Sequence, residues 1–107
     1  MNSSDQLPVA ELIAQELDPD LEELSRVCGL NLDELRQWID EGVAEPRRPD
    51  STRWQFSARQ LRRVWVARRL RRDFELDTRS LPLVLDLIEE LETLRRRVRL
   101  LERVIED

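Results

Sequence analysis

Residues 21–56 read LEELSRVCGLNLDELRQWIDEGVAEPRRPDSTRWQF, and this stretch decides the fold. Asp18 and Pro19, just before it, predict the start of a helix, because an Asp N-cap and a Pro at the first helical position suit a helix end. Gly29 predicts the end of that helix, since glycine reaches positive φ without strain. One apolar face recurs at i, i+3 and i+7, at Leu21, Leu24 and Cys28.

A second helix is predicted over residues 32–41. Asn31 is a suitable N-cap, and Glu34 three residues later makes the pair an Asn-x-x-Glu version of the capping box. Gly42 ends the helix and Pro46 prevents any continuation. Its predicted buried side comprises Leu35, Trp38 and Ile39. Two helices joined by a turn that contains glycine make a helix-turn-helix unit.

The chain after Pro46 predicts a small β wing. Residues 47–53 read RRPDSTR, which is rich in turn-forming residues. Trp54 and Phe56 then alternate with Gln55, and this period of two places both aromatic side chains on one side of a short strand. A helix-turn-helix unit followed by such a loop and strand is a winged helix-turn-helix.

A third helix is predicted over residues 58–74. Ser57 and Gln60 form a Ser-x-x-Gln capping box, and Phe56 can pack on Leu61 as a hydrophobic staple. Seven arginines would be enough for a nucleic-acid patch. They are spread around the helix, so we interpret them instead as partners of acids within the chain or across a dimer. They are Arg59, Arg62, Arg63, Arg68, Arg69, Arg71 and Arg72.

The last helix has the apolar spacing of a coiled coil. Asp77 or Ser80 is its expected cap, and Pro82 must lie within or near its first turn. The a/d pattern then steps by 3 and 4 through Val84, Leu87, Leu91, Leu94, Val98, Leu101 and Ile105. At about 1.5 Å per residue, the pattern is about 33 Å long, which is more than a small body can cover. We therefore predict a symmetric homodimer through this helix.

Two questions about this seam stay open at this point. Packing within one subunit is the alternative to a dimer, above all for the first half of the seam, from Val84 to Leu91. The orientation of the two helices is also undecided. Glu90 lies near one end of the pattern and Arg97 near its middle, which favours an antiparallel pair.

Three motifs follow one another along the chain: GVAEPR at residues 42–47, W-x-F at 54–56 and FELD at 74–77. In this order they resemble the MerR-type winged-helix superfamily and, more narrowly, the CbpM family of chaperone-modulatory proteins. The resemblance covers the chain from about Leu24 to the C-terminus. It implies a mostly α-helical, MerR-like winged helix-turn-helix with a long coiled-coil helix at its end, and an antiparallel dimer.

Three regions are expected: an N-terminal extension over residues 1–20, a winged helix-turn-helix domain over 21–77, and a dimerisation helix over 78–107. The resemblance implies a short strand near residues 7–17. The residues themselves favour a short amphipathic helix there, because apolar positions recur at i, i+3, i+4 and i+8. This helical face carries Val9, Leu12, Ile13, Glu16 and Leu17.

Charge argues against DNA as the partner. Residues 1–50 contain 13 acids and 4 arginines, although the whole chain has a net charge of only −5. A MerR-like regulator inserts its second helix into the major groove and must face phosphates with positive charge. That helix offers four acids here, and Gln37 alone could read a base edge. DNA binding is therefore the alternative function, with backbone contacts from Arg36, Arg47, Arg48 and Arg53.

An acidic surface suits a basic protein partner. The CbpM resemblance implies binding to the J domain of a DnaJ-like co-chaperone of the CbpA type, and inhibition of its activation of the DnaK chaperone. A J domain presents a basic helix to DnaK, so a competitor should be acidic. The predicted contacts are Asp33, Glu34, Asp40, Glu41 and Glu45, with Trp38 as a partly exposed anchor. The alternative for the carboxylates is an ordinary solvated helix face, and for Trp38 a place in the core is the favoured interpretation.

Nothing in the sequence indicates an enzyme or a bound cofactor. The chain has no His and no Tyr, and it contains no Gly-rich phosphate loop. Cys28 is the single cysteine, so it supplies neither a disulfide nor a metal site and reads as a small buried residue. No apolar run approaches the ~20 residues of a membrane span, and the expected location is the cytoplasm.

Overall fold

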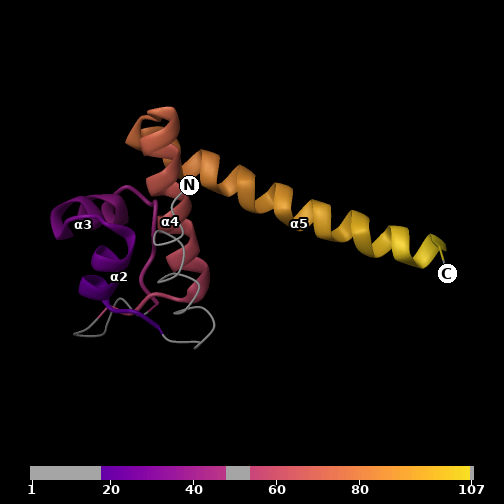
Figure 1. The fold of residues 1–107 in the computed structure, drawn as a ribbon, viewed down its shortest axis with the longest axis horizontal. Coiled ribbons are helices and arrows are strands. Elements are labelled where there is room, and N and C mark those ends of the chain that lie inside the picture. The colour runs from indigo at the N-terminus through magenta and orange to yellow at the C-terminus, as the bar shows by residue number, and fades with distance from the viewer. Residues whose placement is uncertain (1–17, 48–53, 107) are drawn as a thin grey trace.

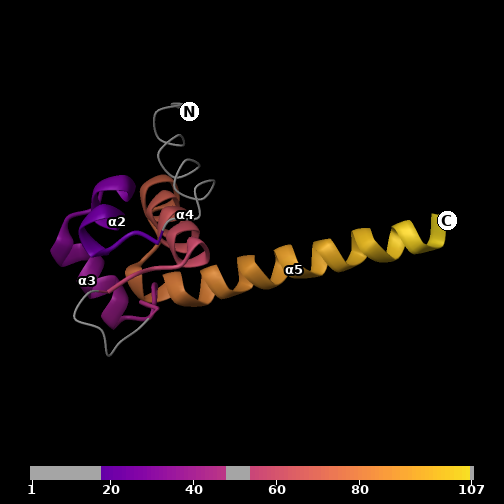
Figure 2. The same cartoon turned by 90° about the horizontal axis from the view of Figure 1, so that it is seen from below.

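The computed structural model of the protein describes residues 18–47 and 54–106. Figure 1 shows the helices between residues 21 and 74 clustered together, a unit here named the head, and a long helix that runs out from it. The turned view in Figure 2 shows the same separation. The elements in chain order are α2 (Leu21–Cys28), α3 (Leu32–Asp40), α4 (Ala58–Phe74), the 3-10 helix η2 (Thr78–Ser80) and α5 (Leu81–Glu106). The predicted mostly α-helical fold class is confirmed for these residues.

Asp20, and not Asp18, is the N-cap of α2, so the start predicted from the sequence was wrong by two residues. The backbone N–H of Glu23 donates to Asp20 Oδ1 at 2.8 Å, and the N–H of Asp20 donates back to Glu23 Oε1 at 3.4 Å. Asp18 has Leu21 three residues later and cannot complete such a capping box. It pairs instead with Arg47, at 2.5 Å.

The turn between α2 and α3 forms as predicted. Gly29 has a φ of 68° and ends α2. Asn31 caps α3, because its Oδ1 accepts from the backbone N–H of Glu34 at 2.8 Å. The Glu34 carboxylate accepts from the side-chain amide of Asn31, rather than from its backbone, also at 2.8 Å. The helix ends at Asp40, one residue before the predicted end, and Gly42 follows with a φ of 85°.

The predicted β wing does not form a strand in the part of the chain that the structure describes. Asp20 and Gln55 make a single antiparallel bridge, and the N–H of Phe56 donates to the Pro19 carbonyl at 3.0 Å. These pairings join the entry to α2 to the entry to α4, but they are too few for a ladder. The loop at residues 48–53 lies outside the described residues.

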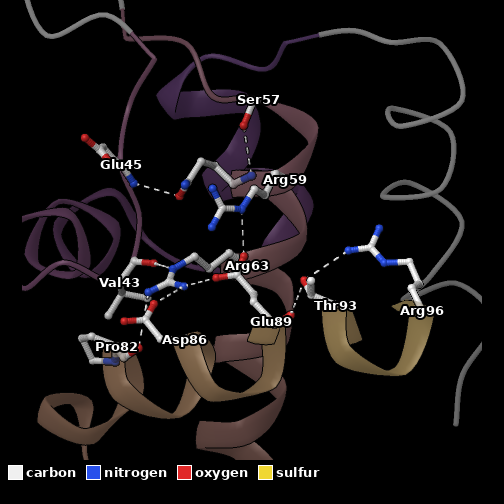
Figure 3. Close-up of polar contacts among 11 residues, drawn as sticks. Val43, Glu45, Ser57, Arg59, Arg63, Pro82, Asp86, Glu89, Thr93 and Arg96 are labelled. Carbon is white, nitrogen blue, oxygen red and sulfur yellow. Dashed lines mark hydrogen bonds and ion pairs between the residues drawn. The ribbon is translucent and has the colours of Figure 1, made fainter. Parts of the chain in front are cut away.

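Helix α4 begins at Ala58 and ends at Phe74, as predicted. Ser57 caps it by accepting from the backbone N–H of Gln60 at 3.2 Å (Figure 3). The Gln60 side chain does not complete a capping box with Ser57. It accepts from the backbone N–H of Glu45 at 2.9 Å, which ties the chain after α3 to α4.

One hydrophobic core holds α2, α3 and α4 together and reaches the first turns of α5. Trp38 and Phe56 are its largest fully buried side chains, and Trp54 packs against it while partly exposed. The core also contains Leu24, Cys28, Leu35, Val43, Ala44, Leu61, Val64, Trp65, Ala67, Leu81 and Leu85. The core therefore fixes the head and only the beginning of α5.

Helix α5 is 26 residues long and loses its cover soon after it begins. Pro82 lies in its first turn, as predicted, and Asp77 caps the preceding η2. Leu81 and Leu85 are its only buried residues. Of the predicted seam, Val84 is partly buried, and the six residues from Leu87 to Ile105 are 47–82% exposed. Within the described chain, nothing covers this seam beyond Val84.

None of the described helices is both long enough and apolar enough to cross a membrane. The amphipathic helix expected at residues 7–17 falls outside the described residues.

Candidate functional site

The solvent side of α3 carries most of the predicted partner-binding carboxylates. Leu35 and Trp38 turn inward, so the opposite side of the same helix faces water. That side exposes Asp33, Asp40 and Glu41, and Glu34 lies at its edge, partly exposed. We name the set of Asp33, Glu34, Asp40, Glu41 and Glu45 the acidic face.

Two members of the acidic face are held by neighbours, and two are not. Glu34 pairs with Arg71 of α4 at 3.4 Å, and Glu41 accepts from the Gln37 amide at 3.3 Å. Asp33 and Asp40 are exposed and make no side-chain hydrogen bond or ion pair with the described residues. These two carboxylates are therefore available to a cation on a partner.

Glu45 lies on the segment between α3 and the wing loop. Its backbone N–H is held by the Gln60 side chain, while its own side chain is exposed. Figure 3 shows the Glu45 carboxylate directed away from Arg59 and Arg63 of α4. The backbone position is thus fixed and the charge remains at the surface.

Trp38 is not a surface anchor. Its side chain is 1% exposed and belongs to the core, so the interpretation of a partly exposed anchor is wrong and the core alternative is confirmed. The physical reason is its helical position, because Trp38 follows Leu35 by three residues and shares its buried side.

The four arginines predicted for a DNA backbone do not form one described surface. Arg36 is exposed on α3, beside the acidic face. Arg47 is already paired with Asp18. Arg48 and Arg53 lie outside the described residues. The structure thus brings the acids of α3 together but does not show a matching basic surface around them.

Arg63 joins the head to α5, and sequence reasoning missed this role (Figure 3). Its side chain is 8% exposed, and its Nε donates to the Val43 carbonyl at 2.6 Å. Its Nη1 contacts Asp86 Oδ1 at 2.9 Å and also pairs with Glu89. The signal was present in the helical spacing, since Arg63 stands four residues before the buried Ala67 on the same face of α4.

Arg59 adds a second contact to the same carboxylate. Its Nε lies 2.9 Å from Glu89 Oε2, and this hydrogen bond raises the pKa of Arg59 above its ordinary value. Arg59 and Arg63 thus bracket Glu89 from two successive turns of α4. The prediction that α4 arginines pair with acids within the chain is confirmed for these two and for Arg71.

Cys28 is a core residue, as predicted. It is fully buried, and burial raises the pKa of its thiol to about 12, although the nearby Arg68 acts in the opposite direction. A protonated, inaccessible thiol is neither a nucleophile nor a metal ligand. No group of three or more His, Cys, Asp or Glu residues within 18–47 and 54–106 could hold a metal ion.

Comparison with known proteins agrees with this arrangement. Residues 20–103 match the family described as MerR HTH family regulatory protein. The chain is 30% identical over 83 residues to the chaperone modulatory protein CbpM of Coxiella burnetii (strain Dugway 5J108-111), a match that covers 78% of each chain. It is 40% identical over 73 residues to the protein of the same name from Salmonella paratyphi A (strain ATCC 9150 / SARB42), covering 68% of this chain and 72% of the relative.

The chain therefore belongs to the MerR helix-turn-helix family and, within it, to the family of CbpM chaperone modulatory proteins. The members of this family are regulators and modulators rather than enzymes. The matched range spans α2 to most of α5, which are the elements that carry the acidic face and the exposed seam.

Proposed function

We propose that this protein binds the J domain of a DnaJ-like co-chaperone of the CbpA type through the acidic face, and thereby inhibits the activation of DnaK by that co-chaperone. The observation that carries the proposal is the exposed side of α3, where Asp33 and Asp40 stand unpaired on a helix anchored by a buried core. The chaperone-modulator relatives support the same class of partner.

The physical argument rests on charge at contact distance. A basic helix that docks against the acidic face meets five carboxylates with Arg36 as the nearest opposing cation on α3. Such complementarity speeds encounter and fixes orientation more than it adds affinity. It also predicts a salt-dependent interaction, because charges at the rim of an interface are screened over about 8–10 Å at physiological ionic strength.

Inhibition follows from competition. A J domain whose basic helix is covered by the acidic face cannot present that helix to DnaK at the same time. The inhibitor needs no catalytic group and no cofactor for this, only a surface held in one shape. The capped ends of α3 and its buried Leu35 and Trp38 provide that rigidity.

DNA binding is the alternative, and the geometry weakens it. In a MerR-like regulator the side of the second helix that enters the major groove must tolerate phosphates. Here that helix exposes Asp33, Asp40 and Glu41, which would repel them. Arg36 remains for a phosphate, while Arg47 would first have to leave Asp18.

We further propose that α5 pairs with α5 of a second copy through the exposed seam. Ten large hydrophobic side chains are exposed in the described chain, and nine of them lie on α5. A solvated apolar stripe of this length is unfavourable unless a partner helix covers it. A symmetric dimer would then carry two acidic faces, one on each head.

The test is a calorimetric titration of the full chain with the isolated J domain of a CbpA-type co-chaperone, at about 50 mM and about 300 mM salt. The proposal predicts saturable binding near one J domain per chain, with weaker affinity at the higher salt. A parallel assay should show less J-domain-stimulated ATP hydrolysis by DnaK as the protein is added. Absence of binding at both salts would refute the proposal and favour a search for duplex DNA.

A further inference from the structure

A crevice of about 690 Å³ lies between the first half of α4 and the middle of α5. Its size falls within the range of small-molecule sites, which is about 300–1,000 Å³. Its apolar lining includes Val66 on α4 and Leu85 and Ile88 on α5. Leu85 is buried and the other two are half-buried, so these three side chains form the inner end of the crevice.

The outer part of the crevice is cationic. Figure 3 shows Arg96 farther along α5 than Glu89, away from the contact with the head. Arg95 and Arg99 stand one turn apart on the α5 side, Arg62 lines the α4 side, and all three are exposed. Their side chains make no hydrogen bond or ion pair with any residue that the structure describes. Three guanidinium groups are therefore available to a ligand.

Two acids share the lining, and neither forms an ion pair with these three arginines. Glu89 is bound by Arg59 and Arg63. Glu92 is exposed and makes no ion pair within residues 18–47 and 54–106. Six arginines thus line the crevice against two carboxylates, although the whole chain has a net charge of −5. An anion is the kind of ligand that this excess of positive charge attracts.

The crevice and the seam lie on different sides of α5. At 3.6 residues per turn, the α5 lining is centred more than about 90° around the helix from the seam. A second copy that covers the seam therefore leaves the crevice accessible. The acidic face is on α3, so a J domain bound there leaves it accessible as well. Binding in the crevice depends on neither contact, and its failure would leave both proposals standing.

We infer that the crevice binds a free amphipathic anion, a small molecule with one alkyl chain and a terminal carboxylate. The alkyl chain lies against Leu85 and Ile88 at the inner end, and the carboxylate meets Arg95 and Arg99 at the outer end. Guanidinium and carboxylate groups match in geometry and form charge-assisted hydrogen bonds. From Leu85 to Arg95, α5 is about 15 Å long at 1.5 Å per residue, which leaves room for an alkyl chain between the two ends.

Calorimetric titration of the full chain with octanoate, decanoate and dodecanoate tests the ligand class, at concentrations below micelle formation. Binding should be saturable and should strengthen with chain length, by up to about fourfold for each added methylene. Decan-1-ol, which has the same chain length as decanoate without the charge, should bind at least about tenfold more weakly than decanoate. Absence of saturable binding, or equal binding of decan-1-ol, would overturn the inference.

A pair of neutral substitutions tests the cationic end. Arg95→Gln with Arg99→Gln should weaken decanoate binding by about tenfold or more and leave the binding of decan-1-ol unchanged. Arg26→Gln with Arg103→Gln is the matched control, because it makes the same charge change at residues that do not line the crevice. The control should bind decanoate within about twofold of the unaltered chain. Equal losses in both variants would mean that only net charge matters and would overturn the inference.

A photoreactive decanoate locates the alkyl chain. With a diazirine at the end of its chain, it should label Val66, Leu85 or Ile88. Labelling of the seam instead, between Leu94 and Ile105, would show that the exposed apolar stripe binds the chain. Co-sedimentation with phosphatidylglycerol vesicles that is lost in the Arg95→Gln, Arg99→Gln variant would identify a membrane lipid, rather than a free amphiphile, as the ligand. Either result would overturn the inference.

Discussion

The head buries its large apolar side chains, whereas α5 exposes most of its own. In the head, Leu35, Trp38 and Phe56 are buried, and the exposed side of α3 is charged. In α5, the residues of the seam from Leu87 to Ile105 are apolar and exposed. The head thus satisfies its hydrophobic side chains within one chain, whereas α5 leaves them for a partner helix.

This difference indicates that the seam of α5 and the acidic face of α3 suit different kinds of contact. An apolar stripe with a heptad period favours a permanent association, because its burial gains free energy with each side chain covered. A charged helix face on a stable core is soluble by itself and suits a transient partner. We expect the seam to set the oligomeric state and the acidic face to select the partner.

The largest effect is expected from breaking the seam. Leu94→Asp with Leu101→Asp should weaken the proposed dimer by more than about 1000-fold, because carboxylates would replace leucines in two layers of the coiled coil. Sedimentation equilibrium should then show monomers at micromolar concentration. Leu100→Asp is the matched control, since Leu100 is equally exposed but outside the a/d pattern. Equal losses in both variants would contradict a heptad seam.

The second largest effect is expected at Arg63, whose substitution should lower the free energy of unfolding because it joins the head to α5. Arg63→Met keeps much of the side-chain volume but leaves the Val43 carbonyl and Glu89 Oε1 without the donor that Arg63 supplies, although Arg59 still binds Glu89 Oε2. Removal of one partner from a buried charged contact costs about 3 kcal/mol. Urea denaturation at fixed chain concentration should show this loss in the free energy of unfolding. Arg62→Met, on the exposed side of α4, should cost less than about 0.5 kcal/mol; a similar cost for both variants would argue against the link.

The stability of the protein at alkaline pH reports on one buried group of the head, the thiol of Cys28. The chain has no Lys and no Tyr, so Cys28 is its only side chain that titrates between about pH 9 and 12. Burial raises the pKa of Cys28 from 9.0 to about 12, so the folded state keeps a proton that the unfolded state releases. The free energy of unfolding should therefore be highest below pH 9 and fall by up to about 1.4 kcal/mol per pH unit up to pH 12.

Cys28→Ala provides the comparison for that slope. The variant should be less stable at neutral pH, yet its stability should vary little between pH 9 and 11. Urea midpoints measured at intervals of half a pH unit would show it. An equally steep decline in the variant would mean that the thiol is not responsible.

A smaller effect should separate the two candidate caps of α2. Asp20→Ala removes the capping box and should cost about 1 kcal/mol, whereas Asp18→Ala removes an exposed ion pair worth at most about 0.5 kcal/mol. Thermal unfolding of the two variants side by side should rank them in this order. The reverse order would contradict the observed N-cap.

Most of the helix ends could be predicted from the sequence. Gly29, Asn31 and Ser57 act as predicted, because each controls backbone atoms within a few residues of itself. The Asp-Pro pair at Asp18 predicted the wrong cap, because the Asp-x-x-Glu motif that starts at Asp20 forms the capping box. Both are local, and the one that satisfies two backbone donors determines the cap.

Tertiary contacts were harder to predict. The role of Arg63 depends on Val43, Asp86 and Glu89, which lie 20 to 26 residues away along the chain. Helical spacing places Arg63 on the buried face of α4, but no local pattern identifies the partners that it finds there. The described part of the wing forms no strand for a related reason, since a strand needs a neighbour paired along its length and Gln55 makes only a single bridge, to Asp20. The acidic side of α3 was predictable because helical period alone decides it.

The central claim is that the acidic face on α3 binds a basic J domain. The most direct test is calorimetric titration of a CbpA-type J domain with two charge-matched variants: Asp33→Arg with Asp40→Arg on α3, and Glu102→Arg with Glu106→Arg on the last turns of α5. The account predicts that the α3 variant loses at least about 100-fold in affinity while the α5 variant binds within about twofold of the unaltered chain. Unaltered binding by the α3 variant, or equal losses in both, would contradict the account.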